Sequence, residues 1–125
     1  MRADRARRDA ARRWGRWSEW LAEALLRAKG FRILARRHRV RGGEIDLIAR
    51  RGDLVLFVEV KARPTLLEAA EAVTSAKRRF MGRAARQWLA SHPSAARCRL
   101  RADAVLVTPW AWPRHVAGVI ELDLD

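Results

Sequence analysis

The sequence predicts an α/β fold in which helices flank a central mixed sheet, in the element order helix, strand, strand, strand, helix, strand, strand. Three observations predict this class. The chain has 125 residues, enough for one hydrophobic core. It is 50% hydrophobic and 33% charged, a balance typical of a globular domain rather than of a disordered chain. Short runs rich in β-branched residues also alternate with segments of helical composition.

The N-terminal part is expected to hold a basic arm and the first helix. The first sixteen residues contain seven arginines and two aspartates, with no core-forming periodicity before Trp14. We therefore expect residues 1–13 to form a flexible, arginine-rich arm and residues 14–125 to form the single folded domain. Residues 14–29 favour helix, and Gly30 ends it, as a glycine just past a helix end often does.

Three strands are expected next. Residues 31–35 form a short strand, followed by a basic loop that runs to Gly43. Residues 44–50 and 54–62 are two further strand candidates. The residues between them include Gly52-Asp53, a pair suited to the tight turn of a β-hairpin, so these two strands are expected to pair.

The C-terminal half predicts one long helix and two strands. Residues 66–90 carry a helical pattern that Ser91-His92-Pro93 breaks. Residues 102–108 form a strand, residues 109–113 a turn rich in tryptophan and proline, and residues 116–122 a last strand.

The hairpin places charged residues together. With a two-residue turn, Asp46 faces Glu59 and Glu44 faces Lys61, and all four side chains lie on one face of the sheet. The alternate side chains are apolar and are expected to line the other face as core: Ile45, Leu47, Leu56, Val58 and Val60.

Two opposed carboxylates predict a cation. Asp46 and Glu59 would repel each other with Cβ atoms ~4.5–5.5 Å apart. A divalent cation removes that repulsion, and carboxylate oxygens suit Mg²⁺ or Mn²⁺. Lys61 would then position or deprotonate a water, or neutralise charge that develops on a phosphate. The alternative is a surface ladder in which Glu44 and Lys61 pair and no metal binds.

Lys77 is exceptional in the long helical segment. At about 100° per residue, it lies in the middle of an apolar stripe, whereas the nearby arginines point away from that stripe. An inward lysine needs an anionic partner, either a sheet carboxylate or a bound phosphate. The alternative is a stem that lies along the core edge with its amine in water. The stripe consists of Ala70, Val73, Met81, Ala84 and Trp88.

Several motifs together resemble the bacterial YraN-like family. They are Gly15-x-x-Ser18-Glu19, Gly43-Glu44-Ile45-Asp46-Leu47-Ile48-Ala49, Phe57-Val58-Glu59-Val60-Lys61-x-Arg63, the later Lys77, and Arg101-x-Asp103. The resemblance extends over residues 15–120. It departs from the family pattern at His38, where asparagine is expected, and at Ala102, where an aromatic is expected.

The resemblance implies a restriction-endonuclease-like fold, related to archaeal Holliday junction resolvases, with Mg²⁺-dependent nuclease chemistry. It implies that Asp46 and Glu59 are metal ligands and that Lys61 is the catalytic lysine. It also implies that Glu19 is a further acidic residue of the site and that Lys77 is the basic residue contributed by the second helix. From helical phase alone, Glu19 could equally be a solvated surface residue.

The charge balance favours a polyanionic partner. The chain has 24 arginines and 3 lysines against 14 acidic residues, a net charge of +13. Nucleic acid, with DNA favoured over RNA, is the expected partner; an anionic membrane surface and the absence of any polyanion are the alternatives. The arginines expected to contact phosphates are Arg36, Arg37, Arg39, Arg41, Arg63, Arg78 and Arg79.

Composition also excludes several classes. The apolar runs are far shorter than the roughly 20 residues that a membrane span needs. Charges occupy the first residues, where a secretory signal has its apolar stretch, so a cytoplasmic location is expected. Cys98 is the single cysteine, so no internal disulfide or cysteine-based zinc site is expected.

These observations together predict a metal-dependent endonuclease that hydrolyses DNA phosphodiester bonds, at branched or other irregular structures. The first alternative is a nucleic-acid-binding protein that keeps a nuclease-derived fold without cutting. The second is a basic accessory protein of RNA-rich assemblies. Trp110 and Trp112 could stack on bases, cover an apolar site or form a dimer contact. A homodimer, with Trp17 and Trp20 in its interface, would present two metal sites to a branched substrate.

Overall fold

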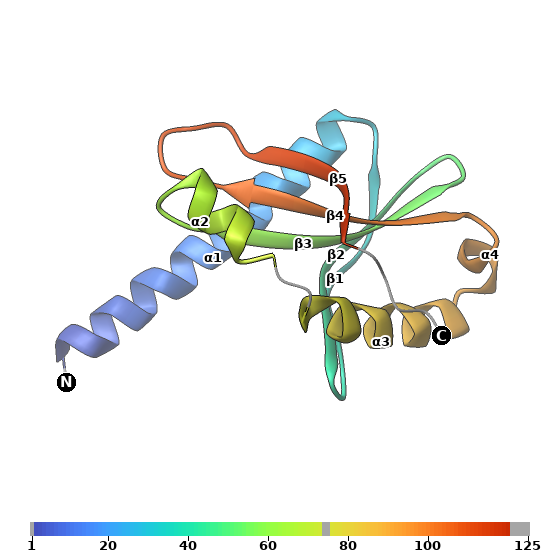
Figure 1. Ribbon diagram of the computed structural model, residues 1–125, viewed down its shortest axis with the longest axis horizontal. Helices are drawn as coiled ribbons and strands as arrows, with labels where there is room; N and C mark the ends of the chain where they lie inside the picture. Colours follow the sequence, from blue (N-terminus) through green and yellow to red (C-terminus); the bar gives the residue numbers. More distant parts are fainter. Residues whose placement is uncertain (1, 74–75, 121–125) are drawn as a thin grey trace.

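The computed structural model describes residues 2–73 and 76–120, with side chains described for all of these except residues 11–12, 76–79 and 119–120. It confirms a mixed α/β architecture (Figure 1). Five strands form one open sheet in the order β1-β2-β3-β4-β5. The elements are α1 (Arg2–Ala28), β1 (Arg32–Val40), β2 (Gly43–Arg51), β3 (Leu54–Ala62), α2 (Leu66–Glu71), α3 (Ala76–Ala90), α4 (Pro93–Ala96), β4 (Arg99–Val107) and β5 (Arg114–Ile120).

The sheet combines antiparallel and parallel pairing. Strands β1, β2 and β3 form an antiparallel meander, β4 lies parallel to β3, and β5 returns antiparallel to β4. The predicted hairpin register is confirmed where Ile48 pairs with Phe57 and Arg51 with Leu54. Gly52 has a φ of 60°, which the tight turn requires and a glycine adopts without strain.

Helices cover both faces of the sheet. On one face, Leu26 of α1 packs in a cluster with Leu47, Leu56 and Val105. On the opposite face, α3 contributes the other core cluster, in which Met81, Ala84 and Trp88 pack against Ile45, Ile48 and Phe57. The face of the hairpin that carries the charged residues is therefore also core further along the strands.

Ile45 lies in a different cluster from Leu47, although both were expected on one face. The end of β2 that holds Ile45 pairs with β1, and two-stranded ribbons twist more strongly than wide sheets. In β1, Arg37 has a φ of 48°, which bends the ribbon further. At its tip Gly43 meets α3 so closely that an added Cβ would lie 2.5 Å from the carbonyl oxygen of Phe80. The ribbon thus turns Ile45 towards α3.

Two helix boundaries differ from the prediction. The helix expected over residues 66–90 is divided into α2 and α3, and residues 74–75 between them lie outside the described residues. The sequence there, Val73-Thr74-Ser75, consists of weak helix formers. Because the phase is interrupted, Ala70 is exposed and Ala69 is buried in its place.

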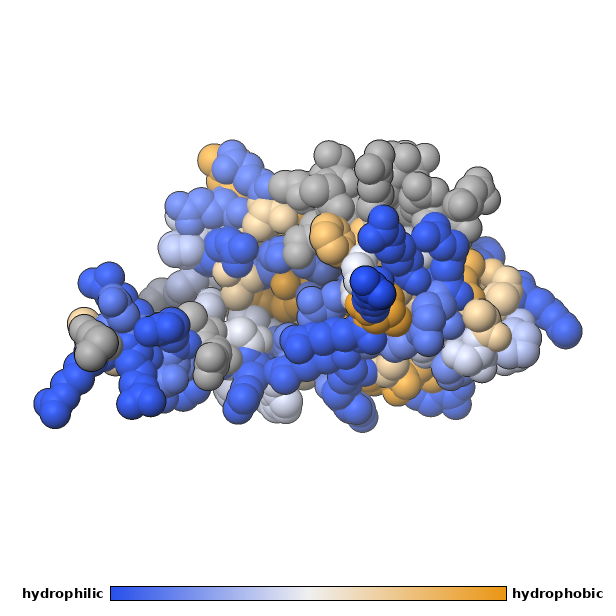
Figure 2. Space-filling view, turned by 90° about the horizontal axis from the view of Figure 1, so that it is seen from below, coloured by the Kyte–Doolittle hydropathy of each residue, from blue (hydrophilic) through white to orange (hydrophobic). Residues whose placement is uncertain are grey.

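The first helix begins at Arg2 rather than at Trp14. Its extra turns consist mainly of arginine and alanine, which are strong helix formers. They project from the domain (Figure 1), and hydrophilic side chains dominate the projecting end (Figure 2). Flexibility of this arm stays a prediction.

Several strand boundaries also differ from the prediction. The basic loop predicted before Gly43 is the second half of β1, while β4 begins at Arg99 and β5 at Arg114. None of the described helices is both long and apolar enough to cross a membrane.

Candidate functional site

The candidate site lies where β2 and β3 diverge. Their pairing ends at Leu47 and Val58, whereas β3 stays paired with β4 as far as Ala62. The ladder therefore stops one residue short of the expected pair of Asp46 with Glu59 and three residues short of the expected pair of Glu44 with Lys61. At this fork the carboxylate of Asp46 replaces a backbone acceptor, because the N–H of Val60 donates a hydrogen bond of 2.7 Å to Asp46 Oδ2.

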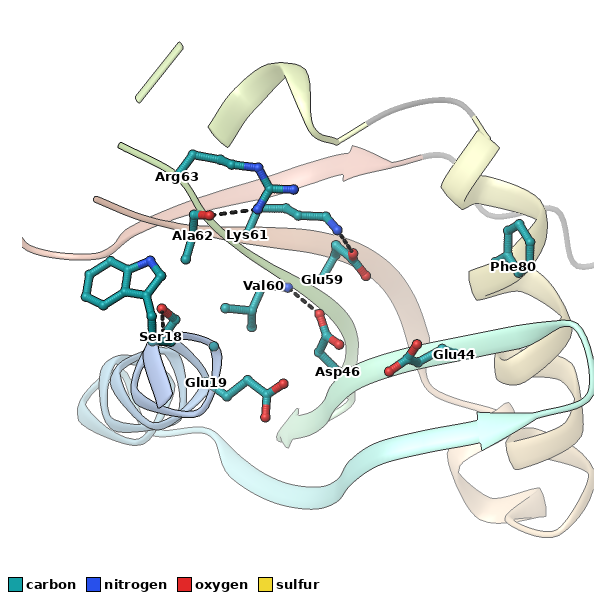
Figure 3. A pocket seen from close by; sticks show the side chains of 12 residues that line it. Ser18, Glu19, Glu44, Asp46, Glu59, Val60, Lys61, Ala62, Arg63 and Phe80 are labelled. Carbon is teal, nitrogen blue, oxygen red and sulfur yellow. Dashed lines mark hydrogen bonds and ion pairs between the residues drawn. The ribbon is translucent and has the colours of Figure 1, made fainter. Parts of the chain in front are cut away.

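The fork opens into a cavity of about 570 Å³ that gathers side chains from three parts of the sequence (Figure 3). Glu19 enters it from α1, Glu44 and Asp46 from β2, and Glu59 and Lys61 from β3. The structure therefore places four of the five predicted catalytic residues on one cavity. The remaining lining residues are Trp14, Gly15, Ser18, Val60, Ala62, Arg63 and Phe80.

Glu59 and Lys61 form an ion pair at the cavity wall. The Lys61 Nζ lies 3.0 Å from Glu59 Oε1, and the two side chains are 15% and 5% exposed. Glu44 instead pairs with Arg39, at 3.0 Å. The pairing of Glu44 with Lys61 that the ladder alternative expected is therefore wrong, whereas metal binding stays a prediction.

Asp46 is the electrostatically perturbed group of the site. Burial, and then the negative charge of Glu59, raise the pKa of Asp46 to about 7, against the smaller opposing effect of the Val60 N–H. The charges of Glu19 and Glu44 act in the same direction as Glu59. Near neutral pH, Asp46 therefore exchanges readily between its protonated and ionised forms, and a nearby cation would favour the ionised form.

The donor set fits a hard cation that is held only in part by protein. Among the described residues, no three His, Cys, Asp or Glu side chains converge as a complete metal-binding cluster. Mg²⁺ commonly takes one or two carboxylates and fills its other positions with water and substrate phosphate oxygens. Asp46 and Glu59 match that pattern. Glu19 is held by Arg37, whose Nε lies 2.7 Å from Glu19 Oε2.

The arginines expected to bind phosphates divide into two groups. Arg36 pairs with Glu23, and Arg37 and Arg39 pair with Glu19 and Glu44, so acidic neighbours offset part of their charge. Arg63 lines the cavity, and Arg41 lines a shallow hollow beside α3 with Arg83 and Arg86. The side chains of the other predicted contacts, Lys77, Arg78 and Arg79, lie outside the described residues.

Sequence reasoning missed the neutral walls of the cavity. Ser18 is buried, and its hydroxyl donates a hydrogen bond of 2.7 Å to the carbonyl of Trp14. The Gly15-x-x-Ser18-Glu19 motif was the available signal. The buried Ser18 lies where α1 faces the cavity, and the next residue, Glu19, enters it.

The Arg101-x-Asp103 motif belongs to a separate cluster. Asp103 is fully buried and accepts hydrogen bonds from Arg101, from His115 at 2.6 Å and from the N–H of Gly118 at 2.8 Å. The pairing of β4 with β5 shifts register between Ala102 and Ala104, so Asp103 braces an irregular strand pair. The Arg101-x-Asp103 motif therefore stabilises the pairing of β4 with β5.

The two departures from the family pattern also have structural places. His38 Nε2 lies 2.8 Å from the side-chain oxygen of Gln87, so His38 links β1 to α3. Ala102 is 2% exposed and packs in the core cluster beneath α3.

The fold and the site together define an α/β protein with carboxylates and a lysine gathered at a forked sheet. Its sequence relatives agree on one family. The chain belongs to the family described as "Uncharacterised protein family UPF0102", whose model matches residues 18–107. This match confirms the membership that the YraN-like motifs predict, and its range includes Glu19, Asp46, Glu59 and Lys61.

The relatives match along nearly their whole length. A UPF0102 protein of Methylocella silvestris is 58% identical over 116 residues, which are 93% of this chain and 94% of the relative. A UPF0102 protein of Mesorhizobium japonicum is 57% identical over 111 residues, 89% of each chain. One of a Chelativorans species is 55% identical over 115 residues, 92% of this chain and 93% of the relative.

Proposed function

We propose that this protein is a metal-dependent endonuclease that hydrolyses DNA phosphodiester bonds, on a restriction-endonuclease-like fold. The observation that carries the proposal is the meeting of Asp46, Glu59 and Lys61 at one cavity. Placing Asp46 beside Glu59 does not stabilise the fold, because the two carboxylates repel each other and burial opposes the charge of Asp46. A cation and a phosphate would turn the same arrangement into a favourable one.

The residues of the cavity have separable tasks in this reaction. When bound between Asp46 and Glu59, Mg²⁺ or Mn²⁺ supplies Lewis-acid polarisation of a phosphate oxygen. In the hydrolysis, a bond forms from a water oxygen to phosphorus while one phosphorus–ester bond breaks. Lys61 reaches the same space, where its ammonium offsets charge that grows on the phosphate oxygens.

Lys61 also keeps the site stable before the substrate arrives. Its contact of 3.0 Å with Glu59 neutralises that carboxylate inside the protein. A cation that binds Glu59 would take over this neutralisation and leave the ammonium for the phosphate. Glu19 stands on the opposite wall, positioned by Arg37, and would orient water rather than complete the ligand set.

The surroundings suit a phosphate backbone. The net charge of +13 attracts a polyanion over a long range, and the attraction weakens as salt rises. Arg63 is exposed at the mouth of the cavity, and its guanidinium donates to the carbonyl of Ala62 at 2.7 Å. It is therefore held at a position from which it can contact a phosphate next to the one that is cut.

The test is cleavage of branched, duplex and single-stranded DNA, with RNA for comparison, in Mg²⁺, in Mn²⁺ and with a chelator. We expect metal-dependent cleavage by the wild type and a loss of about a hundredfold or more in Asp46→Asn and Lys61→Ala. Glu71→Gln is the matched control, because it removes an exposed carboxylate of α2 outside the cavity. It should cut like the wild type.

Two outcomes would overturn the proposal. Equal cleavage by the Asp46 variant and the wild type would show that the site is elsewhere or that the activity is a contaminant. Salt-sensitive binding without cleavage under every metal condition would instead establish the non-catalytic nucleic-acid-binding alternative.

A further inference from the structure

A second cavity adjoins the first and is lined largely by tryptophan. It has a volume of about 470 Å³ and lies between α1 and the loop that joins β4 to β5. We call it the tryptophan pocket. Its lining residues are Trp14, Trp17, Leu21, Thr108, Pro109, Trp110, Ala111 and Trp112.

The indoles of this pocket are presented to solvent. Trp110 and Trp112 are 103% and 93% exposed, so they do not close over an apolar site as a lid would. Trp17 is 52% exposed and stacks on Trp20, with ring centroids 5.1 Å apart and planes at 20°. Exposing this much aromatic surface is costly in water, which indicates a binding surface.

The tryptophan pocket shares a wall with the acidic cavity. Trp14 lines both. On the other side, Arg63 lines the acidic cavity while its backbone N–H donates to the carbonyl of Val107, the residue before Thr108 of the tryptophan pocket. The two cavities are therefore neighbours, so one nucleic-acid chain could contact both.

Charge around the pocket favours a polyanion as its occupant. Arg13 and Arg16 precede Trp17 and Trp20 by four residues, so the two arginines lie on the same side of α1 as these tryptophans. A second copy of this chain would bring the same arginine-rich helix and the same net charge of +13 towards this surface. Nucleic acid would instead neutralise these arginines and offer flat bases to the indoles.

We infer that the tryptophan pocket binds unpaired bases of the nucleic acid whose backbone enters the acidic cavity. The inference rests on the proposed function for the neighbouring phosphodiester, but base binding itself needs no cleavage. Bases within a duplex hide their faces in the stack, so only single-stranded, frayed or branched substrates can fill the pocket. The pocket therefore selects DNA with an unpaired segment beside the cut.

Binding measured in a chelator tests this inference apart from catalysis. The probe is a fluorescein-labelled thymidine oligonucleotide of about twelve nucleotides, a length within the span that one single-strand-binding module covers. A duplex of equal length is the comparison, and anisotropy gives both dissociation constants. We expect Trp110→Ala with Trp112→Ala to weaken single-strand binding about tenfold or more and duplex binding about twofold or less. Trp110→Phe with Trp112→Phe should retain most of the affinity.

Leu67→Ala is the matched control, because Leu67 is 68% exposed on α2, away from both cavities. It should bind both probes like the wild type. Unchanged single-strand affinity in the double alanine variant, with an unchanged melting temperature, would overturn the inference. So would a shift from dimer to monomer in sedimentation with unchanged DNA affinity, since the surface would then join two copies.

The design separates failure of this inference from failure of the proposed function. Asp46→Asn should bind the single strand at least as well as the wild type in chelator, since it removes a negative charge but no indole. If no protein cuts DNA while the tryptophan variants still lose single-strand binding, the nuclease proposal fails and the pocket stands. If the wild type cuts DNA and the tryptophan variants bind every probe normally, the nuclease proposal stands and the inference about the pocket fails.

Discussion

The two strands that flank β3 each carry an aspartate, and the two carboxyl groups have opposite electrostatics. Asp103 of β4 is surrounded by donors, and although burial acts against its charge, hydrogen bonds from His115, Arg101 and the Gly118 N–H lower its pKa to about 2. Asp46 of β2 accepts one backbone hydrogen bond and is close to Glu59, and its pKa is raised to about 7. Burial acts in the same direction on both, so the neighbours decide the difference.

This difference distinguishes a residue that stabilises the fold from one that the fold tolerates. Ionised Asp103 gains interactions on folding, whereas ionised Asp46 loses hydration and gains a repulsion. An ionisable group whose charge opposes folding is more often part of a functional site than a group whose charge is stabilised by its neighbours. Substitutions at the two positions should therefore change stability in opposite directions.

The largest effect is expected for Asp103→Asn. The amide cannot accept the same set of charge-assisted hydrogen bonds, and Arg101 and His115 lose their partner, so the free energy of unfolding should fall by about 3 kcal/mol. Urea denaturation followed by circular dichroism measures it. Asp53→Asn is the control, because Asp53 pairs with Arg99 at 3.1 Å on the open surface, and we expect no measurable change. Equal losses at the two positions would contradict the comparison.

The ionisation of Asp103 should also make the free energy of unfolding depend on pH. The pKa of Asp103 in the folded chain is lower than the usual value of 3.8, so its stabilising contribution is complete above about pH 4 and is lost as the pH falls towards 2. The contribution amounts to about 2 kcal/mol. The free energies of unfolding of the wild type and of Asp103→Asn should therefore approach each other as the pH falls from about 4 towards 2. A constant difference in the free energy of unfolding between the two proteins from pH 5 to pH 2 would mean that Asp103 is not ionised in the native state.

Asp46→Asn should change the free energy of unfolding in the opposite direction to Asp103→Asn. The pKa of Asp46 in the folded chain, about 7, lies above its usual value of 3.8, so ionised Asp46 destabilises the fold increasingly from about pH 4 to pH 7, and by a constant amount above that. The variant should then be more stable than the wild type at pH 8, by about 1–2 kcal/mol, because the amide still leaves an oxygen for the Val60 N–H. Urea denaturation at pH 4 and pH 8 measures it. A variant that is less stable at pH 8 would contradict the assignment.

The alternation of side chains predicted much of this site. Gly52-Asp53 fixed the hairpin, and the spacing along each strand then placed Asp46, Glu59 and Lys61 near one another. It did not predict the fork, because strand separation depends on β1 and β4 competing for β2 and β3, and on the close packing of Gly43 against α3. Local patterns contain no information on that competition.

The Asp103 cluster was less accessible to sequence reasoning. His115 meets Asp103 across a register shift, and a shift of one residue exchanges the faces of a strand. Similarly, the partners of Arg36 and Arg37 lie on α1, so their ion pairs depend on how that helix crosses the sheet. Charge composition predicted a polyanion-binding surface without showing which arginines already have acidic partners.

The smallest effect is expected from metal binding itself. If Asp46 and Glu59 hold Mg²⁺, the cation binds the folded chain alone and stabilises it by about 1.4 kcal/mol at roughly ten times its dissociation constant. It also holds Asp46 ionised, so the stability difference between the wild type and Asp46→Asn at pH 8 should shrink or reverse in Mg²⁺. Thermal unfolding in Mg²⁺ titrations measures this, with Glu71→Gln as the variant that should respond like the wild type. An equal Mg²⁺ response from Asp46→Asn would mean that the raised pKa of Asp46 reflects crowding by carboxylates without a cation to relieve it.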